Sequence, residues 1–187
     1  MNLYLLLFVI SLLCLGLQFE PMHSLSVWDR SAIIDGQWWR ILTGNFTHTN
    51  YTHLGMNLAG LWIISSIFSP SSKSLLLTLV VCSIAVGIGN FASDMTLYVG
   101  LSGALHGLFA YGALKEALHG RQSSWLLVAG LVGKILWEQF VGASETTSAM
   151  IGARVAIESH LAGAISGLLL GYGESIVRRQ SADKKNA

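Results

Sequence analysis

A serine and a histidine far apart in the chain have the side chains that nucleophilic acyl transfer needs. Ser102 lies in the run Gly-Leu-Ser-Gly at 100–103, and His160 begins the run His-Leu-Ala-Gly at 160–163. A serine hydroxyl is a weak nucleophile until an adjacent base takes its proton, and histidine is the base suited to neutral pH. We therefore predict that Ser102 is a nucleophile and that His160 is its general base.

Two further polar residues could bind the oxyanion of a tetrahedral intermediate. His53 and Asn57 are four residues apart, which places them on one face of a helix. A serine at the start of a helix has free backbone N–H groups beside it, so the backbone of Ser102 is a third candidate donor. No Asp or Glu stands at a matching position, and we predict a Ser-His dyad rather than a triad.

The composition indicates a membrane protein with room for one domain. Of the 187 residues, 52% are hydrophobic and 11% are charged, whereas soluble domains average roughly 25% charged residues. The net charge of +1 and the lack of a basic stripe argue against a nucleic-acid partner. No Cys/His set has zinc spacing, so neither a metal nor another cofactor is expected. Cys14 and Cys82 lie in apolar runs and are expected to be buried thiols.

Six apolar segments could each form a spanning helix, which takes about 20 residues. They cover approximately residues 3–19, 53–68, 74–91, 102–114, 124–141 and 157–172. The expected fold is an all-α integral membrane bundle over residues 1–177, followed by a short basic cytoplasmic tail at 178–187. The first segment could instead be a secretory or lipoprotein signal. It lacks a positively charged start and a small-residue cleavage site, so we favour an uncleaved helix.

The distribution of Lys and Arg predicts that both termini are cytoplasmic. The connections on one side and the tail hold Lys73, Lys115, Arg121, Arg178, Arg179, Lys184 and Lys185, and the other side holds Arg30, Arg40 and Arg154. The segment at 20–52 then faces outward. Its aromatic residues favour a compact loop embedded in the headgroup region over a plain external loop; they are Trp28, Trp38, Trp39 and Tyr51.

This orientation puts the candidate residues at one depth. His53, Ser102 and His160 each stand near the outer end of a helix that runs inward. Ionisable groups inside a membrane are unfavourable, so such a cluster is a functional hypothesis by default. Glycines at four-residue spacing could let two of these helices approach closely, although ordinary membrane packing uses the same pattern; they are Gly103, Gly107, Gly163, Gly167 and Gly171.

Taken in chain order, these elements resemble the rhomboid family of intramembrane serine proteases over most of the chain. The matching elements are the pair Trp39-Arg40, the run from His48 to Asn57, the run at 100–103 and the run at 160–167. The resemblance implies that Trp39 and Arg40 anchor the first external loop. It also implies catalytic roles for Ser102 and His160, and an oxyanion hole formed by His53, Asn57 and the Ser102 backbone.

Many rhomboids carry an aromatic residue at the position of His106. The histidine in this chain therefore narrows the resemblance to one subfamily. The run at 100–107 looks more like the rhombosortases, short bacterial rhomboids of the inner membrane. That resemblance implies an active site towards the periplasm. It also implies single-span membrane protein substrates with a C-terminal Gly-Gly motif and apolar helix. The acyl group would pass either to water or to a phospholipid-derived amine.

The remaining polar residues keep alternative interpretations. His106 could be a second base, a support for the site, a substrate contact or a core histidine. His48 could support the oxyanion region or cap the loop. Lys134 and Glu138 could form an internal ion pair or a substrate-facing polar site. Arg154 could meet a substrate carboxylate, a lipid phosphate or the headgroup region.

Two rival functions remain open at this point. A rhomboid-like protein could bind membrane clients without catalysis, and the presence of both Ser102 and His160 argues against that. A small transporter would show an internal repeat and polar residues at mid-depth. Neither feature is evident in the sequence, so we favour the peptidase.

Overall fold

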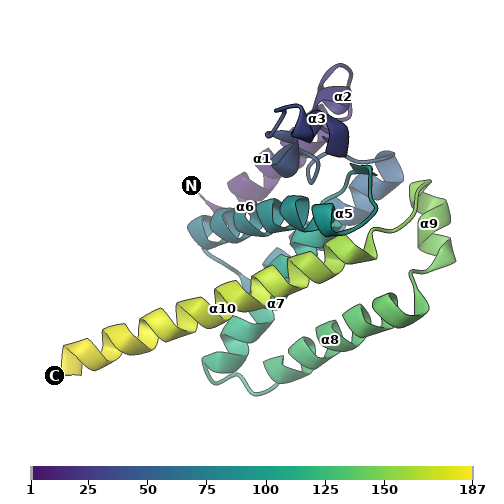
Figure 1. The fold of residues 1–187 in the computed structure, drawn as a ribbon. Coiled ribbons are helices and arrows are strands. Elements are labelled where there is room, and N and C mark those ends of the chain that lie inside the picture. Colours follow the sequence, from purple (N-terminus) through teal and green to yellow (C-terminus); the bar gives the residue numbers. More distant parts are fainter. Residues whose placement is uncertain (1, 187) are drawn as a thin grey trace.

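The computed structural model describes residues 2–186, with side chains for residues 2–178 and 180–181, and it is mainly helical (Figure 1). The elements in chain order are α1 (Leu3–Gly16), α2 (Met22–Ser26), β1 (Trp28–Asp29), α3 (Arg30–Ile34), α4 (Arg40–Thr43), α5 (Tyr51–Phe68), α6 (Ser72–Gly89), the 3-10 helix η1 (Asn90–Ala92), β2 (Leu97–Tyr98), α7 (Ser102–Leu118), α8 (Ser124–Val141), α9 (Glu145–Ile151) and α10 (Ile157–Asn186). Each of the six expected apolar segments is a helix: α1, α5, α6, α7, α8 and α10.

The last helix extends well beyond its expected end at residue 172. α10 continues to Asn186 and projects from the bundle to the C-terminus (Figure 1). No Pro interrupts this stretch, and Glu174 pairs with Arg178 one turn later at 3.2 Å, which supports a helix. The expected basic tail at 178–187 is therefore helical as far as residue 186, and residue 187 lies outside the described residues.

Hydrophobic side chains cover the outside of the bundle as well as its interior. Among the described residues, Ser72–Ala92 and Ser124–Val141 are long and apolar enough to cross a membrane, and α1 is apolar but shorter. Large apolar side chains also point outward, including Phe8, Leu126 and Phe140. An apolar exterior of this extent suits contact with lipid. The count of six spans remains a prediction.

The segment at 20–50 folds as a compact unit, and Arg40 ties it together. Arg40 is buried, and its guanidinium donates to the carbonyls of Ser24 at 2.9 Å and Val27 at 2.7 Å. The indole of the neighbouring Trp39 donates to the Leu25 carbonyl at 3.0 Å. Whether this unit is embedded in the headgroup region stays a prediction.

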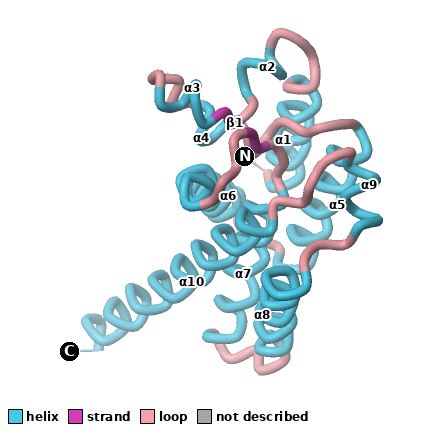
Figure 2. The backbone as a smooth tube through the Cα atoms, turned by 45° about the vertical axis from the view of Figure 1, so that its right-hand side comes forward, coloured by secondary structure: helices cyan, strands magenta, loops and turns pink. Residues whose placement is uncertain are grey.

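Trp28 does not have the exposed interfacial position expected of it. Its side chain is fully buried, and its indole N–H donates to the Gly87 carbonyl at 2.8 Å. Trp28 also pairs with Tyr98 in the short antiparallel ladder between β1 and β2, marked at β1 in Figure 2. A bulky ring that closes the gap between the loop and α6 contributes more to packing than to membrane contact. The loop is thereby joined to the strand that leads to Ser102.

α7 lies inside the bundle and packs against α5, α6, α8 and α10. Its approach to α10 is closest at two pairs of glycines. A Cβ built on Gly163 would lie 1.8 Å from the carbonyl oxygen of Gly103, and one built on Gly167 would lie 2.0 Å from that of Gly107. No side chain fits between these backbones, so the four-residue glycine spacing does serve a close helix contact.

We expect Gly163→Ala to lower the stability of the protein by about 1–3 kcal/mol, because its methyl group must push α7 and α10 apart. Gly173→Ala is the matched control on the same helix, since a Cβ there meets nothing within 4 Å. It should be neutral or stabilising by up to about 1 kcal/mol, because alanine favours helix. Thermal unfolding in detergent micelles measures both, and equal effects would contradict the close contact.

Candidate functional site

Ser102 is the first residue of α7, and the residues before it fix its position. Gly100 has φ +120°, and a Cβ there would lie 2.7 Å from Nε2 of His53. Glycine is therefore required by both the backbone conformation and the space. The N-cap residue Leu101 offers no side-chain acceptor, so no side chain caps the first amides of α7 from that position. Free amides at a helix start favour a negative charge beside Ser102.

The structure brings Ser102 and His160 into hydrogen-bond contact. Ser102 Oγ lies 2.9 Å from Nε2 of His160, although 58 positions separate the two residues. Ser102 is partly buried and His160 is buried at the start of α10. This is the distance at which a histidine can take the proton of an attacking hydroxyl.

A carboxylate lies on the other side of the histidine, so the expectation that no acid accompanies the pair is wrong. Oε2 of Glu138 is 2.9 Å from Nδ1 of His160, and Oε1 accepts from Lys134 Nζ at 2.7 Å. Because an ionised carboxylate only accepts, Nδ1 of His160 carries the proton. The lone pair on Nε2 then faces Ser102, which is the tautomer a general base requires.

The sequence does contain a signal for this contact, which the prediction of a dyad leaves unused. Glu138 stands in the last turn of α8, and His160 stands in the first turn of α10. Consecutive long helices in a bundle run antiparallel, so the end of one meets the start of the next. The local explanation for Glu138, an ion pair with Lys134, is correct and incomplete.

His106 contacts the site without facing the Ser102 hydroxyl as a base. Its Nδ1 donates to the Ser102 carbonyl oxygen at 2.8 Å. Its ring stacks on that of His160, with centroids 4.1 Å apart and an interplanar angle of 20°. Of the alternatives for His106, the geometry fits a support that covers one face of the His160 ring.

His53 and Asn57 lie together beside Gly100, as their spacing predicted. A Cβ on Gly100 would meet both side chains within 4 Å. Asn57 Nδ2 is buried and has no hydrogen-bond partner among the described residues. An unpaired buried donor is unfavourable in a protein interior and calls for an explanation. A transient oxyanion at this position would provide one.

The hydrogen bonds of His53 constrain its role. Thr49 Oγ1 donates to the Ile151 carbonyl oxygen, so the same hydroxyl must accept from Nδ1 of His53 at 3.1 Å. A neutral His53 then has a lone pair, not a proton, on Nε2. Donation from Nε2 to an oxyanion therefore needs either a protonated ring or a rotated Thr49. Thr49 was not among the predicted residues.

His48 supports this region through a ring contact with His53. It is fully buried, and its ring meets that of His53 edge to face at 5.0 Å between centroids. Its backbone carbonyl bonds the ring of His23 at 3.1 Å. Burial, together with the nearby His53 and His23, lowers the pKa of His48 to about 3, so the ring is neutral at physiological pH.

A cavity of about 860 Å³ runs from the Ser102–His160 pair outward between α5 and α8. Its walls are mainly apolar, with residues such as Met56, Leu127 and Trp137. Lys134 and Glu138 also line it. A cavity of this size and character suits an apolar peptide segment.

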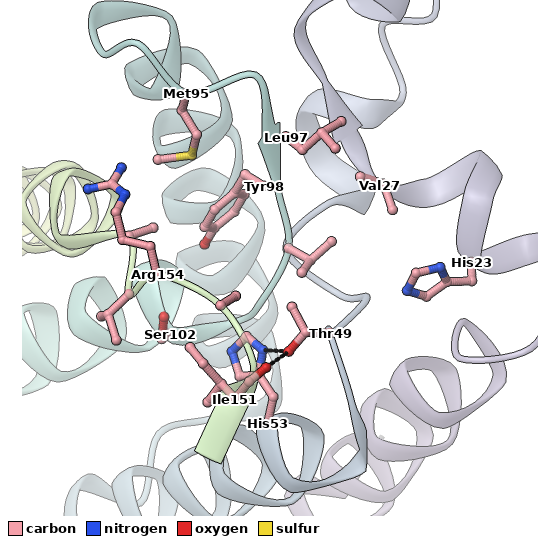
Figure 3. A pocket seen from close by; sticks show the side chains of 14 residues that line it. His23, Val27, Thr49, His53, Met95, Leu97, Tyr98, Ser102, Ile151 and Arg154 are labelled. Atoms are coloured by element: carbon pink, nitrogen blue, oxygen red, sulfur yellow. Dashed lines mark hydrogen bonds between the residues drawn. The ribbon is translucent and has the colours of Figure 1, made fainter. Parts of the chain in front are cut away.

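A second cavity of about 360 Å³ reaches Ser102 from the side of β2 and the loop before α10. Figure 3 looks into it, with Ser102, His53 and Arg154 among the residues that line it. Arg154 also bonds Glu158 at 2.9 Å. Ser102 lines both cavities and so lies where they meet.

Three side chains of the site could also present donors to a metal ion. Ligand atoms of His106, Glu138 and His160 all lie within 4.8 Å of one another. Nδ1 of each histidine is already hydrogen-bonded, and Nε2 of His160 faces Ser102. A metal on His160 would therefore compete with the hydrogen bonds that the Ser102–His160 pair uses.

Comparison with known proteins supports the rhomboid resemblance over most of the chain. A Rhomboid domain model matches residues 35–176. The chain is 25% identical over 171 residues to YdcA of Bacillus subtilis, named as a candidate rhomboid protease, with 81% of this chain and 78% of that protein covered. It is 25% identical over 152 residues to the rhomboid protease GlpG of Haemophilus influenzae, with 80% and 76% covered.

A plant protein is a third relative. The chain is 28% identical over 150 residues to the chloroplastic rhomboid-like protein 11 of Arabidopsis thaliana, covering 71% of this chain and about half, 51%, of that protein. The family model spans well over half of the chain and includes Ser102, Glu138 and His160. This chain belongs to the rhomboid family of membrane proteins, whose proteases are intramembrane serine peptidases.

Proposed function

We propose that this protein is an intramembrane serine peptidase with Ser102 as nucleophile and His160 as general base. The observation that carries the proposal is the 2.9 Å contact between Ser102 Oγ and His160 Nε2. A serine hydroxyl is only a weak nucleophile at neutral pH without such a base. A non-catalytic client-binding protein would have no need of this contact, which makes that rival the weaker candidate.

The reaction proceeds by acyl transfer. As Ser102 Oγ attacks the scissile carbonyl carbon, its proton passes to Nε2 of His160. The tetrahedral intermediate collapses, the peptide C–N bond breaks, and the imidazolium returns the proton to the leaving amine. A second nucleophile, activated by the same histidine, then releases the acyl group from Ser102.

The oxyanion would bind beside Gly100. The candidate donors are Nδ2 of Asn57, the backbone amides at the start of α7, and His53 when Nε2 carries a proton. Asn57 is the strongest side-chain candidate, because its buried amide has no partner within the described residues. Donors that are already in place when charge develops are the most effective kind.

Substrates would be single-span membrane proteins with a C-terminal apolar helix. The 860 Å³ cavity leads from the bilayer side of α5 and α8 to Ser102, which suits an unwound segment of such a helix. The bias of Lys and Arg favours cytoplasmic termini, and the resemblance to the rhombosortases implies a bacterial inner membrane. The catalytic pair would then act near the periplasmic face.

A rhombosortase-like reaction is the second candidate. Here substrates would carry a C-terminal Gly-Gly type of sorting signal, and a phospholipid-derived amine would take the acyl group in place of water. The specific observation in favour is Arg154 in the second cavity that reaches Ser102. A guanidinium is well suited to a phosphate group, so this cavity could hold a phosphate-bearing amine.

Ser102→Ala should abolish both peptide cleavage and labelling by a fluorophosphonate probe, because it removes the hydroxyl that attacks the peptide and that the probe phosphonylates. His160→Ala should lower the rate of labelling by at least 10³-fold, since the hydroxyl loses its base. In-gel fluorescence measures labelling on equal amounts of folded protein. Equal labelling of wild type and Ser102→Ala would rule out the proposed nucleophile.

Asn57→Ala should lower kcat by about 10²–10³-fold, the typical loss for one oxyanion donor. His53→Ala should lower it less, because a neutral His53 that donates from Nδ1 to Thr49 has no proton on Nε2. Kinetics on a fluorogenic single-span substrate compare the two variants. A larger loss in His53→Ala would show that His53 donates from Nε2 during catalysis, with either a protonated ring or a rotated Thr49.

Mass spectrometry of the cleaved product separates hydrolysis from transfer. A free C-terminal carboxylate indicates water as acceptor, whereas an amide-linked phosphate-bearing group indicates transfer. If transfer occurs, Arg154→Gln should reduce the modified product at least tenfold relative to the hydrolysed one, because the cavity loses its phosphate-binding charge. Only the free carboxylate, in wild type with phospholipid present, would exclude the rhombosortase-like reaction.

A further inference from the structure

Glu138 makes a contact that a simple ion pair within α8 does not require. Its carboxylate has two oxygens, and each has one strong partner. Oε1 accepts from Lys134 on the same helix at 2.7 Å, and Oε2 accepts from Nδ1 of His160 on α10 at 2.9 Å. The second contact joins two helices through the ring that faces Ser102.

The exposed fractions of the three side chains show that the carboxylate of Glu138 is turned inward, towards His160. The side chain of Lys134 is about half exposed at 48%, whereas those of Glu138 and His160 are 11% and 6% exposed. If the carboxylate of Glu138 paired only with Lys134, it would be better solvated by turning outward, towards the exposed ammonium group of that lysine. A buried charge is unfavourable unless it is compensated, and Lys134 supplies that compensation at the edge of the site.

His160 is restrained on its remaining sides as well. The His106 ring covers one face at 4.1 Å, and His106 is itself fixed by its bond to the Ser102 carbonyl. With Glu138 on Nδ1, the ring can neither flip nor turn without losing a hydrogen bond. A base held in this way keeps Nε2 directed at Ser102 before a substrate arrives.

We propose, resting on the peptidase function above, that Glu138 is the residue that positions and charge-stabilises His160, with Lys134 holding its carboxylate in place. The site is then a Ser102–His160–Glu138 triad. When Ser102 Oγ–H gives its proton to Nε2, the imidazolium that forms keeps its Nδ1 proton against the carboxylate of Glu138. Glu138 remains ionised throughout, and the transferred proton leaves on the amine product.

The test uses the full-length protein in detergent micelles and a fluorophosphonate probe, so no natural substrate has to be known. Glu138→Gln removes the charge and nearly preserves the shape. The labelling rate at saturating probe should fall on the order of 10²- to 10⁴-fold, while the half-saturating concentration of the probe changes little. Glu138→Asp keeps the charge at a shorter reach and should retain a larger share of the rate.

Two readouts separate a positioning role from a structural one. The acid limb of the pH–rate profile should move to lower pH in Glu138→Gln, because the carboxylate no longer favours the charged imidazole. In a His160→Ala background, Glu138→Gln should cause almost no further loss, since the carboxylate acts through that ring. If the losses of labelling rate in the two variants were additive and the pH–rate profile of Glu138→Gln were unchanged, the proposal would be overturned.

Glu174→Gln is the matched control, far from the site on α10. Glu174 also pairs with a lysine, Lys115, at 3.0 Å and is 30% exposed. It should reproduce any loss of thermal stability but leave the labelling rate and profile unchanged. Ser102→Ala is a second control in the same experiment. Full labelling of that variant would refute the peptidase function itself. Wild-type rate and profile in Glu138→Gln, with Ser102→Ala inactive, would refute the triad alone.

Discussion

The site depends on how closely the backbones of α7 and α10 approach each other. A serine side chain is short, so its hydroxyl meets a ring on another helix only when the two helices nearly touch. Gly163 against Gly103 and Gly167 against Gly107 permit that, since a Cβ at either α10 position would overlap a carbonyl oxygen of α7. The 2.9 Å contact of Ser102 with His160 follows from this packing.

Other parts of the molecule add restraints to that contact. Gly100 bonds the Gly44 carbonyl at 3.0 Å, so the Arg40-tied loop holds the turn that precedes Ser102. From the opposite side, α8 brings Glu138 against His160. In a poorly solvated interior each of these hydrogen bonds is stronger than in water, and an unpaired group there is correspondingly unfavourable. The loop and α8 therefore limit the positions available to the pair.

The site residues that could be predicted from the sequence are those that lie in recognisable motifs and at the same depth in the membrane. Residues whose partner lies on a distant element could not be predicted in this way. Ser102, His160 and His53 stand in the first turn of their helices, and Asn57 follows His53 by one turn. Polar residues near the ends of apolar runs are visible without a structure. Glu138 had a sufficient local partner four residues away, which concealed its contact with α10. Thr49 reaches Ile151 across 102 positions, a pairing that periodicity cannot indicate. The extension of α10 was missed because the sixth segment was bounded by hydropathy, which falls at residue 172 while helix propensity does not.

In the proposed peptidase reaction, the two cavities that Ser102 lines would give the two half-reactions separate routes. An acyl-enzyme would keep the acyl segment in the larger apolar cavity between α5 and α8. The second nucleophile would then have to approach from elsewhere, and the smaller cavity beside Arg154 reaches the same hydroxyl. Water needs no charged group to enter there, whereas a phosphate-bearing amine does. If the acceptor is such an amine, Arg154 is the side chain in this wall that would bind its phosphate.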